Sequence, residues 1–273
     1  MTVEAEIRAF AESIATAVDR TCGEPVAWRP GTTSDDRRPE LTAALATAGW
    51  PSVGEDPELL PFVGPGGREL GRRLAPLCEL DILLGGSPLA GELVRYCGEG
   101  ELAVRVEPDA LTLIRIQRSL PCPYGDAIGV ARVVSAADDR RIDGRIASAR
   151  LAAWIAATVG YCAGVGEFAF ELTLDYARNR RAFGTTLAGL APVQQLLADA
   201  ATAVGGLSLL ASGLPDAAAL AHAGRALCDA TALSQQVSGA IAFTLEYPLQ
   251  RAYRRARTLK LWSDAVLDKL VDG

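Results

Sequence analysis

The sequence predicts a mainly α-helical protein with N-terminal helices, a reduced β segment and a C-terminal four-helix bundle. Three observations support this. Of the 273 residues 49% are apolar, which is enough for a substantial core. Alternating, β-branched sequence is confined to residues 101–134, and helical periodicity runs from residue 146 almost to the end. We expect a helical region over 1–98, a shortened β segment over 99–140 and the bundle over 141–273.

Composition narrows the classes of function. The net charge of -6 argues against nucleic-acid binding through bulk charge. The acidic N-terminus lacks an apolar signal core and no apolar run is flanked like a membrane span, so we expect a cytoplasmic protein without a membrane partner. The six cysteines show no ligand-like spacing, so neither a metal site nor a disulfide framework is expected. The single histidine, His222, lies in an Ala-rich helical stretch and fits a structural position.

The first hundred residues predict helices separated by Gly- and Pro-rich breaks. Ile7–Asp19 places its apolar residues on one face. Pro39–Ala48 is a second helix, which ends at Gly49-Trp50-Pro51. The remaining expectations are a loop over 24–36, a broken stretch over 55–67 and helical pieces over 68–76 and 80–97.

Three short strands are expected next, over Leu102–Val106, Leu111–Ile116 and Gly129–Val134. Pro108 and Asp109 supply the turn between the first two strands. A sheet of this size is barely stable alone, so we expect it to lean on helices.

Four long helical segments follow, joined by short turns, so neighbouring helices should pack antiparallel. Gly160, Gly164 and Gly166 lower the helix propensity of the first segment. That cost is easier to understand if a neighbouring helix or subunit presses on the same face. The four segments are Ile146–Tyr176, Pro192–Ala211, Pro215–Phe243 and Tyr247–Leu270.

The junction between the first two of these segments is the arginine-rich stretch Arg178–Gly184. One interpretation is a capped helix–turn–helix: Gly184 suits a helix C-cap, Pro192 suits a first helical turn, and cations complement the end of a helix dipole. The other interpretation is an anion-binding turn between two helices. The stretch alone does not decide between them.

The C-terminal half resembles the acyl-CoA dehydrogenase family through motifs that occur in the family's order. Shorter N-terminal stretches, Leu41–Trp50 and Glu69–Pro76, are similar to the family's first helical domain and to its branch that acts on bulky acyl groups, sterol catabolites among them. The C-terminal motifs are Ala156–Gly160, Asp175–Gly184, Val193–Asp199 and Gln236–Glu246.

The resemblance implies that FAD binds across a subunit interface. Arg180 and Phe183 match residues that contact the adenine and pyrophosphate end of the flavin on a neighbouring subunit. Gln236 and Gly239 match the segment that closes over the pyrophosphate. The chemistry agrees, because a guanidinium offers a forked donor set to phosphate and a glycine lets the backbone approach closely.

The sequence also departs from the family's pattern. Residues 101–134 leave room for only a remnant of the β-barrel that holds the flavin ring. Ala240 and Ala242 replace two glycines of the phosphate segment. The family's two positions for the catalytic base fall near Ser263 and Trp154, so Asp264, beside the first, is the remaining candidate and the catalytic base is left unassigned.

Three hypotheses follow. The first is a subunit of an acyl-CoA dehydrogenase that performs α,β-dehydrogenation of a bulky acyl-CoA, with FAD at an interface shared with a homologous subunit, in a heterotetramer or a homo-oligomer. The second is a flavin-free relative that performs cyclisation or dehydration of an acyl chain in an apolar cleft between the helices. The third is a non-catalytic scaffold that assembles through its Ala- and Gly-rich helix faces.

Overall fold

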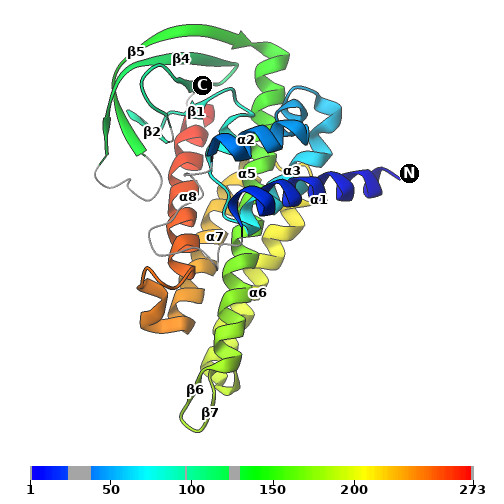
Figure 1. Cartoon of the computed structure of the whole chain (residues 1–273), viewed down its shortest axis with the longest axis vertical. Helices are drawn as coiled ribbons and strands as arrows, with labels where there is room; N and C mark the ends of the chain where they lie inside the picture. Colours follow the sequence, from blue (N-terminus) through cyan, green and yellow to red (C-terminus); the bar gives the residue numbers. More distant parts are fainter. Residues whose placement is uncertain (1, 24–37, 96, 123–129, 272–273) are drawn as a thin grey trace.

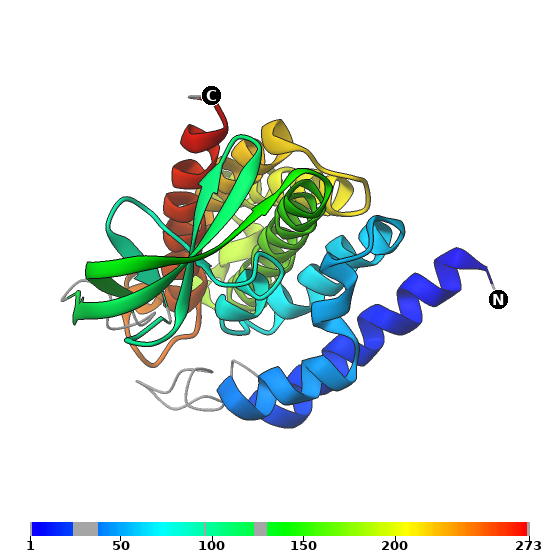
Figure 2. The same cartoon turned by 90° about the horizontal axis from the view of Figure 1, so that it is seen from above.

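A computed structural model describes all residues except 1, 24–37, 96, 123–129 and 272–273. The chain forms an elongated helical bundle with a curved sheet over one end and a short hairpin at the other (Figure 1). The N-terminal helices pack along one side of the bundle, as the view from above shows (Figure 2). The expected fold class, mainly α with a β remnant and a C-terminal four-helix bundle, is confirmed.

The N-terminal helices are α1 (Val3–Cys22), α2 (Arg38–Thr47) and α3 (Leu60–Arg72). The Thr2 hydroxyl accepts a hydrogen bond from the Ala5 N–H (3.4 Å) and so caps α1. The 3₁₀ turns η3 (Trp50–Gly54) and η4 (Pro57–Leu59) lead into α3. The loop expected over 24–36 lies outside the described residues.

Helix α3 corrects the expectation of a broken stretch over 55–67. Pro61 stands in its first turn, where a missing N–H costs nothing, and Pro65 is inside the helix. The glycines that suggested a break serve helix packing instead. A Cβ on Gly67 would overlap the backbone of Ala157, so α3 and α5 (Gly144–Asn179) cross at backbone contact.

The same contact explains the glycines of α5. A Cβ on Gly160 would overlap the Gly64 carbonyl, and one on Gly164 would overlap the Arg68 carbonyl. A neighbouring helix therefore presses on this face of α5, as the sequence suggested. The contact also fixes how closely the N-terminal helices approach the bundle.

The helical piece expected over 80–97 is wrong. Only α4 (Cys78–Asp81) is helical there, and the chain then enters β1 (Ser87–Pro88) and β2 (Leu93–Arg95). Gly85 has φ +93° in the turn between α4 and β1, and a Cβ on Gly86 would lie 2.5 Å from the Leu102 carbonyl oxygen. Strand pairing therefore overrides the helical periodicity of this segment.

The sheet also contains β3 (Leu102–Glu107), β4 (Ala110–Pro121) and β5 (Val130–Asp143), in the order β1-β3-β4-β5-β2. Strand β1 is parallel to β3 and the other pairs are antiparallel. Strand β5 continues well past the expected end at Val134, because its polar second half pairs with β4. It leads directly into α5 at the top of the bundle (Figure 1).

The bundle is completed by α6 (Ala191–Ala211), α7 (Ala217–Ser238) and α8 (Leu249–Val271). The third expected helix ends five residues early, since Gly239 takes φ +70° and the 3₁₀ turn η6 (Gly239–Phe243) follows. Helices α5 and α6 are long and apolar enough to cross a membrane by length and composition alone. The apolar window of α5 is 67% buried inside the protein, whereas the apolar window of α6 is 22% buried.

Candidate functional site

The arginine-rich junction folds as a hairpin. Helix α5 ends at Asn179, and the Arg180 N–H still donates to the Tyr176 carbonyl (2.8 Å). Two short strands, β6 (Arg181–Ala182) and β7 (Thr185–Thr186), then pair around Phe183 and Gly184, which have φ +51° and +83°. A turn with positive φ at both central residues matches the twist of a hairpin. It leaves the Phe183 side chain 94% exposed.

The second predicted segment lies where α7 ends. Gln236 is exposed in the last turn of α7, and Gly239 follows at the C-cap with open space where a Cβ would stand. The chain then presents apolar side chains to solvent, with Phe243 69% exposed and Leu245 52% exposed. This stretch combines an accessible backbone with an exposed apolar rim.

The hairpin and the end of α7 belong to the same end of the bundle. Ala177 on α5, Leu197 on α6 and Val237 on α7 form one buried cluster beneath them. The rings of Tyr176 and Tyr247 lie 6.0 Å apart, and burial raises the pKa of Tyr247 to about 12. The β6–β7 hairpin and the end of α7 therefore lie toward the end opposite the sheet, which we call the hairpin end (Figure 1). These segments contain Arg180, Phe183, Gln236 and Gly239.

Cationic and apolar groups dominate the surface of the hairpin end. Arg178 and Arg180 are exposed, and the Arg181 guanidinium reaches the Gly184 carbonyl at 3.5 Å. Phe183 and Phe243 add exposed aromatic rings to this end. The arrangement can bind an anionic group beside aromatic and aliphatic surface.

The positions where the resemblance locates a catalytic base lie at the other end, beneath the sheet. Ser263 is buried inside an uninterrupted α8, and Asp264 is half-exposed and forms an ion pair with Lys260 one turn earlier. Trp154 is fully buried and its indole N–H donates to Asp81 Oδ1 (3.3 Å). Neither position presents a carboxylate to a cleft.

A buried ion pair, missed by the sequence reasoning, lies between these positions. Arg95 on β2 donates through Nη2 to Asp81 Oδ1 (2.6 Å) and through Nε to Asp81 Oδ2 (2.9 Å). Both side chains are almost completely buried, and the Trp262 ring covers the guanidinium with its centroid 5.4 Å away. Residues 80–97 suggested a helix, so nothing in the sequence pattern paired Asp81 with Arg95. Among the described residues, no group of three or more His, Cys, Asp and Glu side chains could hold a metal ion.

Comparison with known proteins agrees with this architecture. Residues 143–263 match the family described as Acyl-CoA dehydrogenase, C-terminal domain. The 3-sulfinopropanoyl-CoA desulfinase of Paraburkholderia xenovorans is 35% identical over 113 residues, which is 37% of this chain and 29% of that protein. The matched segment therefore spans less than a third of this curated relative.

Two solved structures share the fold over nearly the whole chain. A variant of the Tcur3481–Tcur3483 steroid ACAD superposes with a TM-score of 0.70 at 17% identity, covering 99% of this chain and 98% of that one. The ChsE4–ChsE5 complex from Mycobacterium tuberculosis gives 0.67 at 16% identity, covering 100% and 96%.

The fold and the hairpin end define a helical protein with an exposed, arginine-bearing end opposite a sheet-covered end. The family match gives this class a name for part of the chain: residues 143–263 are similar to an acyl-CoA dehydrogenase C-terminal domain.

Proposed function

We propose that this chain is a subunit of an acyl-CoA dehydrogenase assembly. It would hold the nucleotide end of FAD at an interface with a homologous subunit, in a heterotetramer or a homo-oligomer. The reaction would be α,β-dehydrogenation of a bulky acyl-CoA, of the kind met in steroid catabolism, in the cytoplasm. The observation that carries the proposal is that the four motif residues, Arg180, Phe183, Gln236 and Gly239, occupy one exposed end of the bundle.

The hairpin end fits the nucleotide part of a flavin. The exposed Arg180 guanidinium can donate two parallel hydrogen bonds to a phosphate. The open space at Gly239 lets a phosphate approach its backbone. Of the two alanines that replace family glycines, Ala242 is fully buried, so its methyl group packs in the core and does not crowd this surface.

The sheet end does not offer the remaining parts of a dehydrogenase site. Trp154 and Ser263 stand at the two base positions, and Asp264 pairs with Lys260. When bound, the flavin supplies the hydride-accepting chemistry. In this proposal the chain's own residues bind the pyrophosphate and exclude water from it, and the partner supplies the carboxylate that takes the proton.

The apolar surface of the hairpin end supports a partner subunit. Phe183 in the hairpin and Phe243 after α7 are each more than two-thirds exposed, and Leu245 is 52% exposed. Exposed aromatic and aliphatic side chains grouped in this way mark protein contact sites. The neighbours of known structure include a two-component steroid ACAD and a two-component complex, which supports a homologous partner.

The test is coexpression with a full-length acyl-CoA dehydrogenase from the same source. We expect the chain alone to be colourless, and the copurified complex to absorb at about 450 nm and to oxidise a bulky acyl-CoA, because the flavin carries the hydride chemistry. Copurification without flavin, or a flavin-loaded complex that oxidises no acyl-CoA with the chain present, would overturn the proposal.

A second candidate is flavin-free chemistry or ligand binding by the chain itself. It is favoured by a partly open cavity of about 460 Å³ whose lining residues all belong to this chain. The cavity lies beside α4 and the first strands, instead of in the apolar cleft between late helices that the sequence suggested. Turnover of an acyl-CoA by the colourless chain alone would favour this candidate over the assembly subunit.

A further inference from the structure

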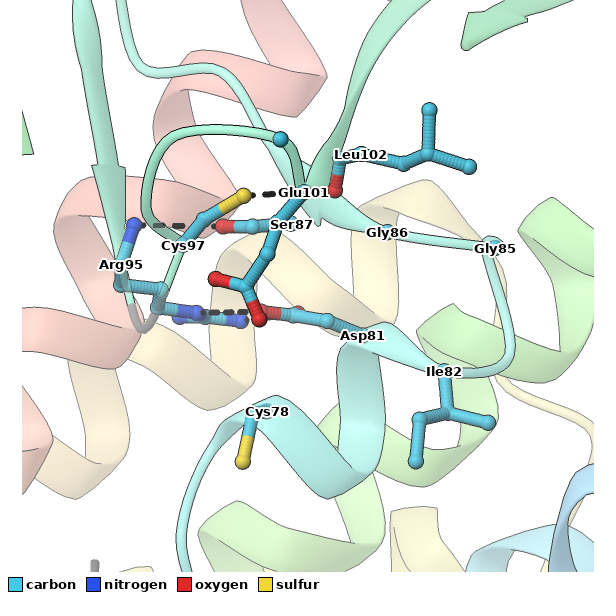
Figure 3. Close-up of a pocket in the computed structure, with 11 residues that line it drawn as sticks. Cys78, Asp81, Ile82, Gly85, Gly86, Ser87, Arg95, Cys97, Glu101 and Leu102 are labelled. Carbon is cyan, nitrogen blue, oxygen red and sulfur yellow. Dashed lines mark hydrogen bonds and ion pairs between the residues drawn. The ribbon is translucent and has the colours of Figure 1, made fainter. Parts of the chain in front are cut away.

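The cavity is lined by both apolar and charged side chains. It lies between α4 and the strands β1, β2 and β3, at the sheet end of the molecule (Figure 3). Its volume of about 460 Å³ falls in the range of small-molecule sites, which combine apolar walls with a few placed polar groups. Ile82 and Leu102 contribute apolar wall, and Asp81, Arg95 and Glu101 contribute charge.

The walls of the cavity are set by backbone contact. Gly85 and Gly86 carry the chain from α4 into β1, and at Gly86 the backbone approaches β3 more closely than a side chain would allow. The Arg95 N–H donates to Ser87 Oγ (3.2 Å), which ties β2 to β1 across the cavity. The backbones of β1, β2 and β3 therefore set this side of the cavity.

Arg95 supplies the main recognition group. Its Nε and Nη2 are used by Asp81, whereas Nη1 is buried and has no hydrogen-bond partner among the described residues. The whole side chain is 1% exposed and lines the cavity. A buried donor on a charged group strongly favours any acceptor that can reach it.

The charge of the lining selects the kind of acceptor. Asp81 and Glu101 contribute two carboxylates against the single guanidinium of Arg95, and Figure 3 shows the Glu101 carboxylate pointing toward the ion pair. The Glu101 carboxylate is itself held by the Gly98 N–H (2.6 Å). An anionic ligand would meet this excess of negative charge, so a neutral oxygen acceptor is preferred.

We propose that this cavity binds a neutral, mainly apolar small molecule through one carbonyl or hydroxyl oxygen, which accepts a hydrogen bond from Arg95 Nη1. Ile82 and Leu102 contact the apolar body of the ligand. The proposal does not rest on the flavin or on a partner subunit, because every group it uses belongs to this chain.

The experiment titrates the purified full chain with the bicyclic ketone decalone, the hydrocarbon decalin and decalin carboxylate, following tryptophan fluorescence and the melting temperature. Trp154 and Trp262 both contact the ion pair and report on the site. We expect saturable binding of the ketone, at least tenfold tighter than of the hydrocarbon or the carboxylate, since a hydrogen bond to a charged group is worth about tenfold or more in affinity.

Two variants identify the site. Asp81→Asn combined with Arg95→Met removes the donor without leaving a buried charge and should weaken ketone binding about tenfold. Ile82→Trp should fill the cavity and abolish binding, and Ile146→Trp is the matched control at an isoleucine that is 60% exposed outside the cavity. Absent ketone binding, equal affinity for ketone and hydrocarbon, tighter binding of the carboxylate, or binding that survives Ile82→Trp would each overturn the proposal.

Discussion

At the sheet end of the molecule Arg95 is buried against Asp81 and covered by Trp262, whereas at the hairpin end Arg180 and Phe183 are exposed. The same residue types therefore have opposite environments. At the sheet end the chain satisfies its own charged and aromatic groups. At the hairpin end these groups face solvent.

This difference predicts that the two ends contribute to different properties, the sheet end to folding stability and the hairpin end to assembly. Residues of the sheet end should determine whether the chain folds, because an unpaired buried charge is costly. Residues of the hairpin end should scarcely affect folding, because exposed side chains contribute little to it. They should instead determine what the folded chain binds.

Breaking the buried ion pair should have the largest effect. Arg95→Met leaves Asp81 buried without its partner and should lower the free energy of unfolding by about 3–5 kcal/mol. Urea denaturation measures this. The control is Arg105→Met, which removes an ion pair between two exposed side chains, Arg105 and Asp138 (3.3 Å), and should cost at most about 1 kcal/mol. Equal losses in the two variants would remove the distinction between a buried pair and a surface pair.

Disrupting the contact between α3 and α5 should have the second largest effect on stability. Gly164→Ala inserts a methyl group against the backbone of α3 and should destabilise the chain by about 3 kcal/mol. Gly205→Ala places the same methyl group on α6, where nothing lies within 4 Å, and should stabilise by about 1 kcal/mol through helix propensity. Denaturation midpoints of the two variants should move in opposite directions, and a shift in the same direction would contradict the packing described for α5.

A substitution at the hairpin end should weaken binding to the partner subunit and leave the stability of the isolated chain unchanged. Phe183→Asn keeps a residue type that tolerates positive φ but removes the exposed ring. It should weaken association with the partner subunit by about 2 kcal/mol, as aromatic anchors at interfaces do. Analytical ultracentrifugation of the complex measures the loss. An unchanged association constant, or a large fall in the stability of the isolated chain, would speak against an interface here.

The smallest expected effect is a difference in reactivity among the cysteine thiols. Burial raises the pKa of the Cys162 thiol to about 12, so this thiol remains protonated and unreactive at pH 8 and becomes a thiolate only near pH 12. Cys122 is half-buried, whereas Cys22, Cys78, Cys97 and Cys228 are buried. A disulfide reagent at pH 8 should modify Cys122 first. Rapid modification of Cys162 in the native chain would show that the centre of the bundle opens.

The sequence predicted the late helices well because their apolar periodicity is long, and Gly160 and Gly164 within α5 lie at a helix crossing. It failed over residues 55–67, where Pro65 and Gly67 look like helix breakers but lie within α3. It also failed over 80–97, where the chain turns at Gly85 and Gly86 and enters strands. Helix contact and strand pairing decide these segments, and both depend on residues distant in sequence.

The residues of the candidate sites were likewise predictable from the sequence only in part. The motif residues of the hairpin end lie on two local segments, so a resemblance of short stretches could locate them. The Asp81–Arg95 pair joins a short helix to a strand that was expected to be helical, so only the three-dimensional structure brings it together.

Flavin content of the coexpressed complex tests the central claim most directly. We expect the complex to retain FAD, and the complex carrying Arg180→Ala to lose most of it while still assembling, because the guanidinium fork to the phosphate is gone. The matched control Arg145→Ala changes an exposed arginine near the sheet end and should retain the flavin. Equal flavin content in all three complexes would contradict the assignment of the hairpin end as the nucleotide-binding surface.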